Sequence, residues 1–357
     1  MVDPSRTRRR NAHLLALLTA AIAACGTDIT TSSGGPDASA DAAGATDASA
    51  DGAADAAALL DGPSPSDAGA DACPPGTQPD GDGGCIALTV RRPFLIGASL
   101  RLADAAPRAD WAPDAPPCDV PCAVTRAWLA EAWLRDGLEE HASIAAFARF
   151  TMMLLAVGAP PELVVASQRA SLDEVRHAKD CFALAARYGA APRGPAPLSI
   201  DGALGATPTL LELVALTAEE GCVGETLGAA VAAEQADRAT DPHAKEVLAR
   251  LARDEARHAE LAWRFVAWAV ARGGAPVREA AARAIDRAVA ATRANPIREY
   301  PGVDMALWRA HGRLACDEAR AAAEAAIREV VAPSLAALAG VAGVAGRAVV
   351  ADAPARA

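Results

Sequence analysis

Two near-identical hexapeptides, DEVRHA and DEARHA, contain residue types that bind metal ions. In each, a glutamate precedes a histidine by three positions, and side chains three apart on a helix share one face. Glu174 with His177, and Glu255 with His258, therefore form two pairs of potential ligands. Both pairs fall within segments of apolar, helical periodicity, where burying a carboxylate and an imidazole costs several kcal/mol unless a partner compensates. A bound metal ion would be such a partner.

Upstream of each pair lies a stretch with helical periodicity that carries further glutamates. A four-helix dinuclear site takes one carboxylate from each of two such helices, in addition to two Glu-x-x-His pairs. The first stretch, 123–157, supplies Glu140, which lies 34 residues before the glutamate of the first pair. The second stretch, 208–239, supplies Glu220, which lies 35 residues before the glutamate of the second pair. This spacing predicts an internal repeat of two helix pairs.

The ligand from the third helix is open between two glutamates. Glu220 is favoured by the repeat and by its place on an apolar stripe with Leu213, Leu216, Val223 and Leu227. Glu225 lies five residues further on, about 140° round an α-helix. It could be a seventh ligand or could replace Glu220.

Together these motifs resemble those of the ferritin-like di-iron carboxylate superfamily, over residues 123–273. The resemblance implies an all-α fold, a ferritin-like four-helix bundle that binds two iron ions, or manganese in their place. The implied ligands are Glu140, Glu174, His177, Glu220, Glu255 and His258, with Glu174 and Glu255 bridging the two ions and Glu225 as the competitor of Glu220. The aspartate before each pair would orient the histidine of the other pair and fix its tautomer. These aspartates are Asp173, opposite His258, and Asp254, opposite His177.

The resemblance also implies a reaction. Metals with open positions would react with dioxygen or peroxide, so the protein would be an oxidoreductase that oxidises or oxygenates a small molecule, or one that detoxifies the oxidant. The alternative is a structural or interaction lipoprotein whose metal only stabilises the bundle. The sequence assigns no catalytic residue beyond the ligands and no substrate.

Residues 1–24 resemble a bacterial lipoprotein signal peptide. They combine four arginines near the start, a short apolar run and the small residues Ala23 and Ala24 directly before Cys25, as at a lipoprotein cleavage site. The apolar run is shorter than the about 20 residues that a permanent membrane span needs. We therefore expect cleavage before Cys25, lipidation of that cysteine, and attachment to a membrane of the bacterial cell envelope, the outer membrane being favoured.

Residues 25–72 are rich in aspartate and alanine and poor in residues that build a core, which predicts a disordered tether. The tether holds much of the acidity behind the formal net charge of −11 and leaves the remainder close to neutral. Nothing in this charge distribution indicates a nucleic-acid partner.

Residues 73–122 are predicted to form a small loop-rich module with strands at 86–90 and 94–102. Its cysteines are candidates for two disulfides, because an exported chain meets an oxidising compartment. They are Cys73, Cys85, Cys118 and Cys122. The pairing is open, and a zinc site with four cysteine ligands is the alternative.

The C-terminal part, 274–345, is predicted to pack on the bundle as two extra helices, at 277–294 and 305–339, followed by a tail at 346–357. Nothing in these helices indicates chemistry. His311 is expected on a solvated face.

Overall fold

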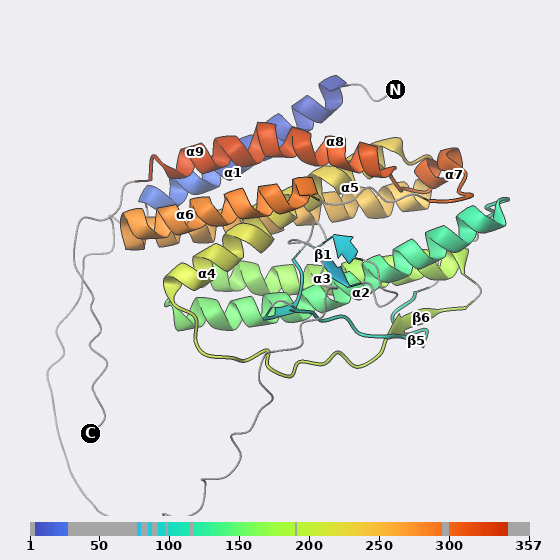
Figure 1. The fold of residues 1–357 in the computed structure, drawn as a ribbon, viewed down its shortest axis with the longest axis horizontal. Helices are drawn as coiled ribbons and strands as arrows, with labels where there is room; N and C mark the ends of the chain where they lie inside the picture. Colours follow the sequence, from blue (N-terminus) through green and yellow to red (C-terminus); the bar gives the residue numbers. More distant parts are fainter. Residues whose placement is uncertain are drawn as a thin grey trace, which may run out of the picture.

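The computed structural model describes residues 4–27, 77–79, 85–87, 92–97, 99–113, 118–189, 191–294 and 300–341 (Figure 1). The predicted tether beyond its first three residues, Cys73 and the predicted C-terminal tail lie outside these residues, as do the side chains of Cys25 and Cys85.

Helices dominate the described part of the chain, which confirms the all-α class. The helical elements are α1 (Pro4–Thr27), α2 (Ala123–Ala156), α3 (Pro161–Tyr188), α4 (Leu210–Thr217), the π-helix η2 (Ala218–Glu225), α5 (Thr226–Arg238), α6 (Pro242–Ala294), α7 (Met305–Ala310), α8 (Cys316–Ala326), the π-helix η3 (Ile327–Val331) and α9 (Ala332–Leu338). The strands are short: β1 (Thr77–Pro79), β2 (Cys85–Ala87), β3 (Leu95–Ile96), β4 (Ser99–Leu100), β5 (Ala105–Pro107) and β6 (Arg193–Pro195).

Two pairs of helical rods form the centre of the molecule (Figure 1). α2 packs along α3, and α6 packs along the continuous run of α4, η2 and α5. Local residues explain where the rods begin and end. Gly158 takes a positive φ of 65° before α3 begins at Pro161, and Asp241 accepts a hydrogen bond from Ala244 N at the start of α6. Glycine tolerates positive φ, and an aspartate satisfies the free N–H groups of a first helical turn.

Two apolar cores lie along these rods, with buried polar residues between them. On α2, Trp133 belongs to one core and Phe147 to the other, and the buried Glu140 lies between them. On α3, the buried His177 lies just before Phe182 of the first core. Burying each such large side chain stabilises the fold by roughly 1.5–3 kcal/mol. The same packing keeps water away from the polar layer, where interactions between charges are correspondingly stronger.

The segment before α2 packs on the bundle. Its predicted strand at 94–102 is interrupted, because Gly97 takes a φ of 61° and turns the chain between the antiparallel strands β3 and β4. The predicted strand at 86–90 is described only as β2, which pairs with β1. β5 pairs with β6 from the connection after α3, and Phe94 is buried against α2. Long-range pairing therefore fixes this segment to the helices.

The predicted disulfides are not observed at Cys118 and Cys122, the two candidate cysteines whose side chains the structure describes. Cys118 and Cys122 carry free thiols. The reason is geometric: Cys122 is the residue just before α2, whereas Cys118 Sγ lies 3.8 Å from His311 Nδ1, a partner remote in sequence.

The C-terminal helices break at places that the sequence analysis did not predict. The predicted helix 277–294 is the second part of α6, which kinks at Gly274, where φ is 66°. The predicted helix 305–339 is divided into α7 and the run of α8, η3 and α9, because Gly312 takes a φ of 84°. A Cβ at this glycine would lie 2.5 Å from Leu248 Cδ1, so a larger residue requires the Leu248 side chain to shift, in addition to adopting a positive φ.

α1 lies along α6, η3 and α9 (Figure 1). Its apolar face is buried through Leu14, Leu18 and Ile22, and the Asn11 side chain donates a hydrogen bond to Glu329 at 2.8 Å. Among the described residues, no helix combines the length and apolar character that crossing a bilayer requires.

Candidate metal centre

Six buried side chains from α2, α3, η2 and α6 converge in the polar layer. The ligand atoms of Glu140, Glu174, His177 and Glu255 lie within 4.8 Å of one another, and so do those of Glu225, Glu255 and His258. Glu255 belongs to both groups, and none of the six residues is more than 2% exposed. The fold thus brings together ligands that lie on four helical segments.

The two glutamates of the Glu-x-x-His pairs lie between the two histidines. Glu174 directs Oε2 toward His177 Nδ1 at 3.5 Å and Oε1 toward His258 Nδ1 at 3.1 Å. Glu255 directs Oε1 toward His177 Nδ1 at 4.0 Å and Oε2 toward His258 Nδ1 at 3.5 Å. Each carboxylate therefore presents one oxygen to each of two positions, as a carboxylate that bridges two metal ions does.

The outer nitrogen of each histidine faces an aspartate from the other helix. His177 Nε2 lies 3.1 Å from Asp254 Oδ2, and His258 Nε2 lies 3.4 Å from Asp173 Oδ2. An Nε2–H that donates to a carboxylate fixes the ring orientation and leaves the lone pair of Nδ1 for a metal ion. The two aspartates expected to orient the histidines are thus in a position to do so.

Several inward-facing atoms lack a hydrogen-bond partner within the described part of the chain. They are His177 Nδ1, His258 Nδ1, Glu174 Oε2 and Glu255 Oε2. Buried polar groups are nearly always paired, so four such atoms around one centre call for an additional partner. Carboxylate oxygens and imidazole nitrogens form the mixed donor set that iron and manganese ions accept, so these residues fit such ions.

The charges in the cluster also favour cations. Burial and then the neighbouring Glu255 raise the pKa of Glu225 well above its ordinary value. Burial alone would lower the pKa of His177, but the neighbouring carboxylates of Asp254 and Glu174 raise it to about 10. In the absence of a metal ion, Glu225 and His177 therefore hold protons that reduce the repulsion among the crowded carboxylates. Metal ions would replace them, because binding requires neutral imidazole and ionised carboxylates.

Of the two glutamates considered for the third helix, the cluster contains Glu225 and not the favoured Glu220. Both residues lie in η2, and a π-helix closes its turns with i→i+5 hydrogen bonds. Residues five apart therefore lie nearly above one another instead of about 140° apart, as in an α-helix. Glu225 reaches the cluster, and Glu220 stays one turn nearer to α4. The spacing of the repeat favours Glu220 only if the third helix is a continuous α-helix, whereas this segment is a π-helix.

Glycines within the third helix are a sequence signal for this irregularity. At Gly221, a Cβ would lie 2.5 Å from Ala262 Cβ and 2.6 Å from Arg92 Nη2. Glycine is unfavourable in a helix interior by up to about 1 kcal/mol, so its presence here reflects close approach of α6 and of an arginine.

Arg92 is a residue of the site that the sequence analysis missed. It comes from the segment before α2, is 2% exposed, and its Nε lies 3.3 Å from Glu225 Oε1. Its guanidinium lies 4.5 Å from the centre of the Phe147 ring and 4.6 Å from that of Phe150. Stacking on two aromatic rings offsets part of the cost of burying the charge. Arg92 thus holds the Glu225 carboxylate by a buried ion pair.

Glu220 lies near the same arginine, outside the cluster. Burial raises its pKa to about 7, although Arg92 and Arg149 act in the opposite direction. Its Oε1 has no hydrogen-bond partner in the part of the molecule that the structure describes.

A cavity of about 340 Å³ lies between α2, α5 and the C-terminal helices. Its lining includes Glu139, which precedes the ligand Glu140, and Gly228, which follows the ligand Glu225 by three residues. Aromatic rings of α2, of α7 and of the segment before α7 form much of the remaining wall, with two ion pairs at its side. The lining thus includes residues close in sequence to two of the converging ligands, but none of the six ligands themselves.

No family model, curated protein or solved structure matches the chain.

Proposed function

We propose that the protein belongs to the ferritin-like di-iron carboxylate superfamily and binds two iron ions, or manganese in their place, that react with dioxygen or peroxide. The observation that carries the proposal is the arrangement of Glu174 and Glu255, each with one oxygen toward each histidine. Glu140 would complete one metal position and Glu225 the other. Two bound iron ions would supply the redox chemistry that activates an oxidant.

The remaining residues prepare the site for this reaction. Asp173 and Asp254 orient the two histidines, and Arg92 keeps the Glu225 carboxylate in place. The two apolar cores exclude water, which protects reactive species from side reactions. The cavity beside Glu139 and Gly228 offers a route for a small substrate or for the oxidant itself.

Metal analysis of the purified full-length chain tests the proposal. We expect two equivalents of iron or manganese per chain, and nearly none after replacement of both Glu174 and Glu255 by Ala. A matched double variant, Glu162→Ala with Glu246→Ala, removes two glutamates that do not face the cluster and should keep both equivalents. Two equivalents in the Glu174/Glu255 variant would show that the metal site lies elsewhere.

The reaction is tested separately by colour. The iron-loaded, reduced protein should change its visible absorption when air or peroxide is added, and the Glu174/Glu255 variant should not. A metal-loaded protein whose spectrum stays the same under both oxidants would instead support the structural alternative, in which the metal only stabilises the bundle.

A further inference from the structure

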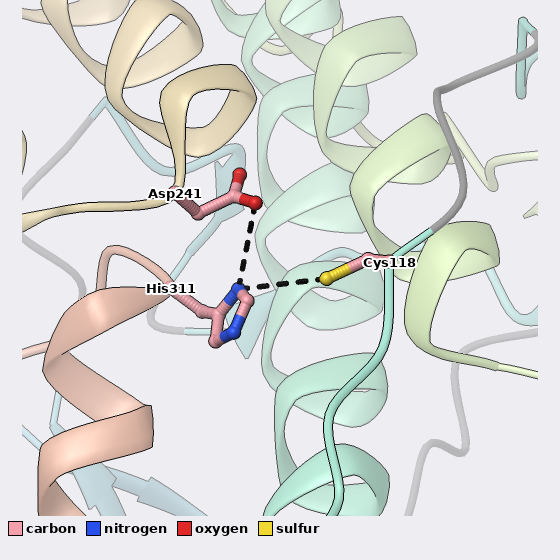
Figure 2. Close-up of side chains that lie close together, drawn as sticks. All are labelled: Cys118, Asp241 and His311. Atoms are coloured by element: carbon pink, nitrogen blue, oxygen red, sulfur yellow. Dashed lines mark hydrogen bonds and ion pairs between the residues drawn. The ribbon is translucent and has the colours of Figure 1, made fainter.

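A second group of potential ligands lies at the ends of several helices, apart from the carboxylate cluster (Figure 2). Cys118 precedes α2, Asp241 directly precedes α6, and His311 directly follows α7. One ligand atom from each lies within 4.8 Å of the others. The solvated position predicted for His311 is wrong, because its side chain is buried. The contact partners lie far from it in sequence, so local periodicity gave no indication of this.

The side chains approach one and the same ring nitrogen. His311 Nδ1 lies 3.8 Å from Cys118 Sγ and 3.9 Å from Asp241 Oδ2, and the two dashed lines in Figure 2 meet at this atom. In a catalytic relay the nucleophile and the carboxylate contact opposite nitrogens of the ring. This arrangement therefore does not suit a cysteine nucleophile activated by histidine. It suits three donors directed toward a common ion.

The donor set matches zinc. Thiolate, imidazole and carboxylate bind Zn²⁺ at about 2.3, 2.0 and 2.1 Å, so neighbouring ligand atoms of a tetrahedral site lie about 3.3–3.6 Å apart. The distances from His311 Nδ1 exceed this range by only a few tenths of an ångström. Small side-chain movements would close the site around an ion.

We propose that Cys118, Asp241 and His311 form a mononuclear zinc site. The fourth position falls to water or to the hydroxyl of Tyr188, whose oxygen lies 3.1 Å from His311 Nδ1. The site ties the segment before α2 to the start of α6 and the end of α7. It thereby stabilises the fold in the way that the expected disulfides would have done.

Asp241 is held in place for this role. Arg187 donates to both of its oxygens, at 2.7 and 3.0 Å, and Ala244 N donates to Oδ1 at 2.8 Å. Each carboxylate oxygen has two lone pairs, so Oδ2 can accept from the arginine and still face a metal ion. Hydrogen bonds to a ligand carboxylate orient it and increase metal affinity.

Cobalt substitution tests the proposal, because a thiolate bound to Co²⁺ gives a charge-transfer band in the near ultraviolet that carboxylate and imidazole ligands do not give. The full-length chain, prepared with Co²⁺, should show this band, and Cys118→Ser should abolish it. Cys122→Ser is the matched control: it removes a free thiol four residues away and should leave the band unchanged.

Zinc analysis gives a second measurement that does not depend on colour. Cys118→Ser and His311→Ala should each lower bound zinc by one equivalent relative to the wild-type chain, while circular dichroism reports that the helices remain. The absence of the cobalt band in the wild-type chain, or its persistence in Cys118→Ser, would overturn the proposal. So would peptide mapping that finds Cys118 in a disulfide in the purified protein.

Discussion

The π-helix at the third helix makes a prediction that separates two glutamates five residues apart. Glu225→Ala should remove one of the two metal equivalents, whereas Glu220→Ala should keep both. The repeat in the sequence predicts the opposite, so the pair of variants compares the local sequence pattern directly with the tertiary structure.

The size of the effect follows from the ligands around each position. Glu225 joins Glu255 and His258 in one group of ligand atoms, so its loss removes one of few donors. Replacing a residue that only hydrogen-bonds to a metal ligand already lowers metal affinity about 10- to 100-fold. Loss of a ligand itself should cost at least about 100-fold, or about 2.7 kcal/mol.

Glu220 contributes no atom to either group. Because burial raises its pKa to about 7, much of it is protonated near neutral pH, and its removal deletes no fixed negative charge from the metal site. We therefore expect its replacement to change metal affinity by less than about threefold, which is about 0.7 kcal/mol.

Titration of the metal-free variants with Fe²⁺ under anaerobic conditions measures both stoichiometry and affinity. Circular dichroism controls for helix content. If Glu220→Ala loses an equivalent and Glu225→Ala keeps two, the third helix is a regular α-helix in the metal-bound protein and the register described above is incorrect.

Three further predictions concern other parts of the chain. Gly312→Ala should destabilise the fold by roughly 2–4 kcal/mol in urea unfolding, since it combines a positive φ with overpacking against Leu248; an unchanged midpoint would contradict this. Burial alone would raise the pKa of Glu318, but a backbone N–H and Arg309 lower it, so this carboxylate adds stability above pH 4.5 that is lost as the pH falls further. Glu318→Gln should accordingly cost about 1–2 kcal/mol at neutral pH and progressively less in acid, and a constant difference would disprove the reasoning. Cys25→Ala should release the protein from the membrane fraction, and a variant that stays there, or a mature chain that retains α1, would refute lipidation at this cysteine.

The helical class and most of the candidate metal ligands can be predicted from the sequence alone. Glu174, His177, Glu255 and His258 could be recognised because a three-residue spacing on a helix is a local property. Glu140 followed from the repeat, because α2 and α3 are regular α-helices joined by a short connection. Local periodicity is sufficient where the helix is regular.

Tertiary structure decided the features that depend on contacts between distant segments. η2 is π-helical where Gly221 allows close approach of Ala262 and Arg92, and this irregularity exchanges Glu220 for Glu225. Apart from the glycines of this helix, no local pattern indicates it, because the contacts that accompany it come from α6 and from the segment before α2.

The same reason applies to the Cys118, Asp241 and His311 group. Its members are separated by more than a hundred residues or by whole helices, and their spacing matches no metal-binding motif. They meet only because the ends of α2, α6 and α7 meet in the folded chain. A site assembled from helix ends depends on the relative placement of helices, which is a property of packing and not of sequence periodicity.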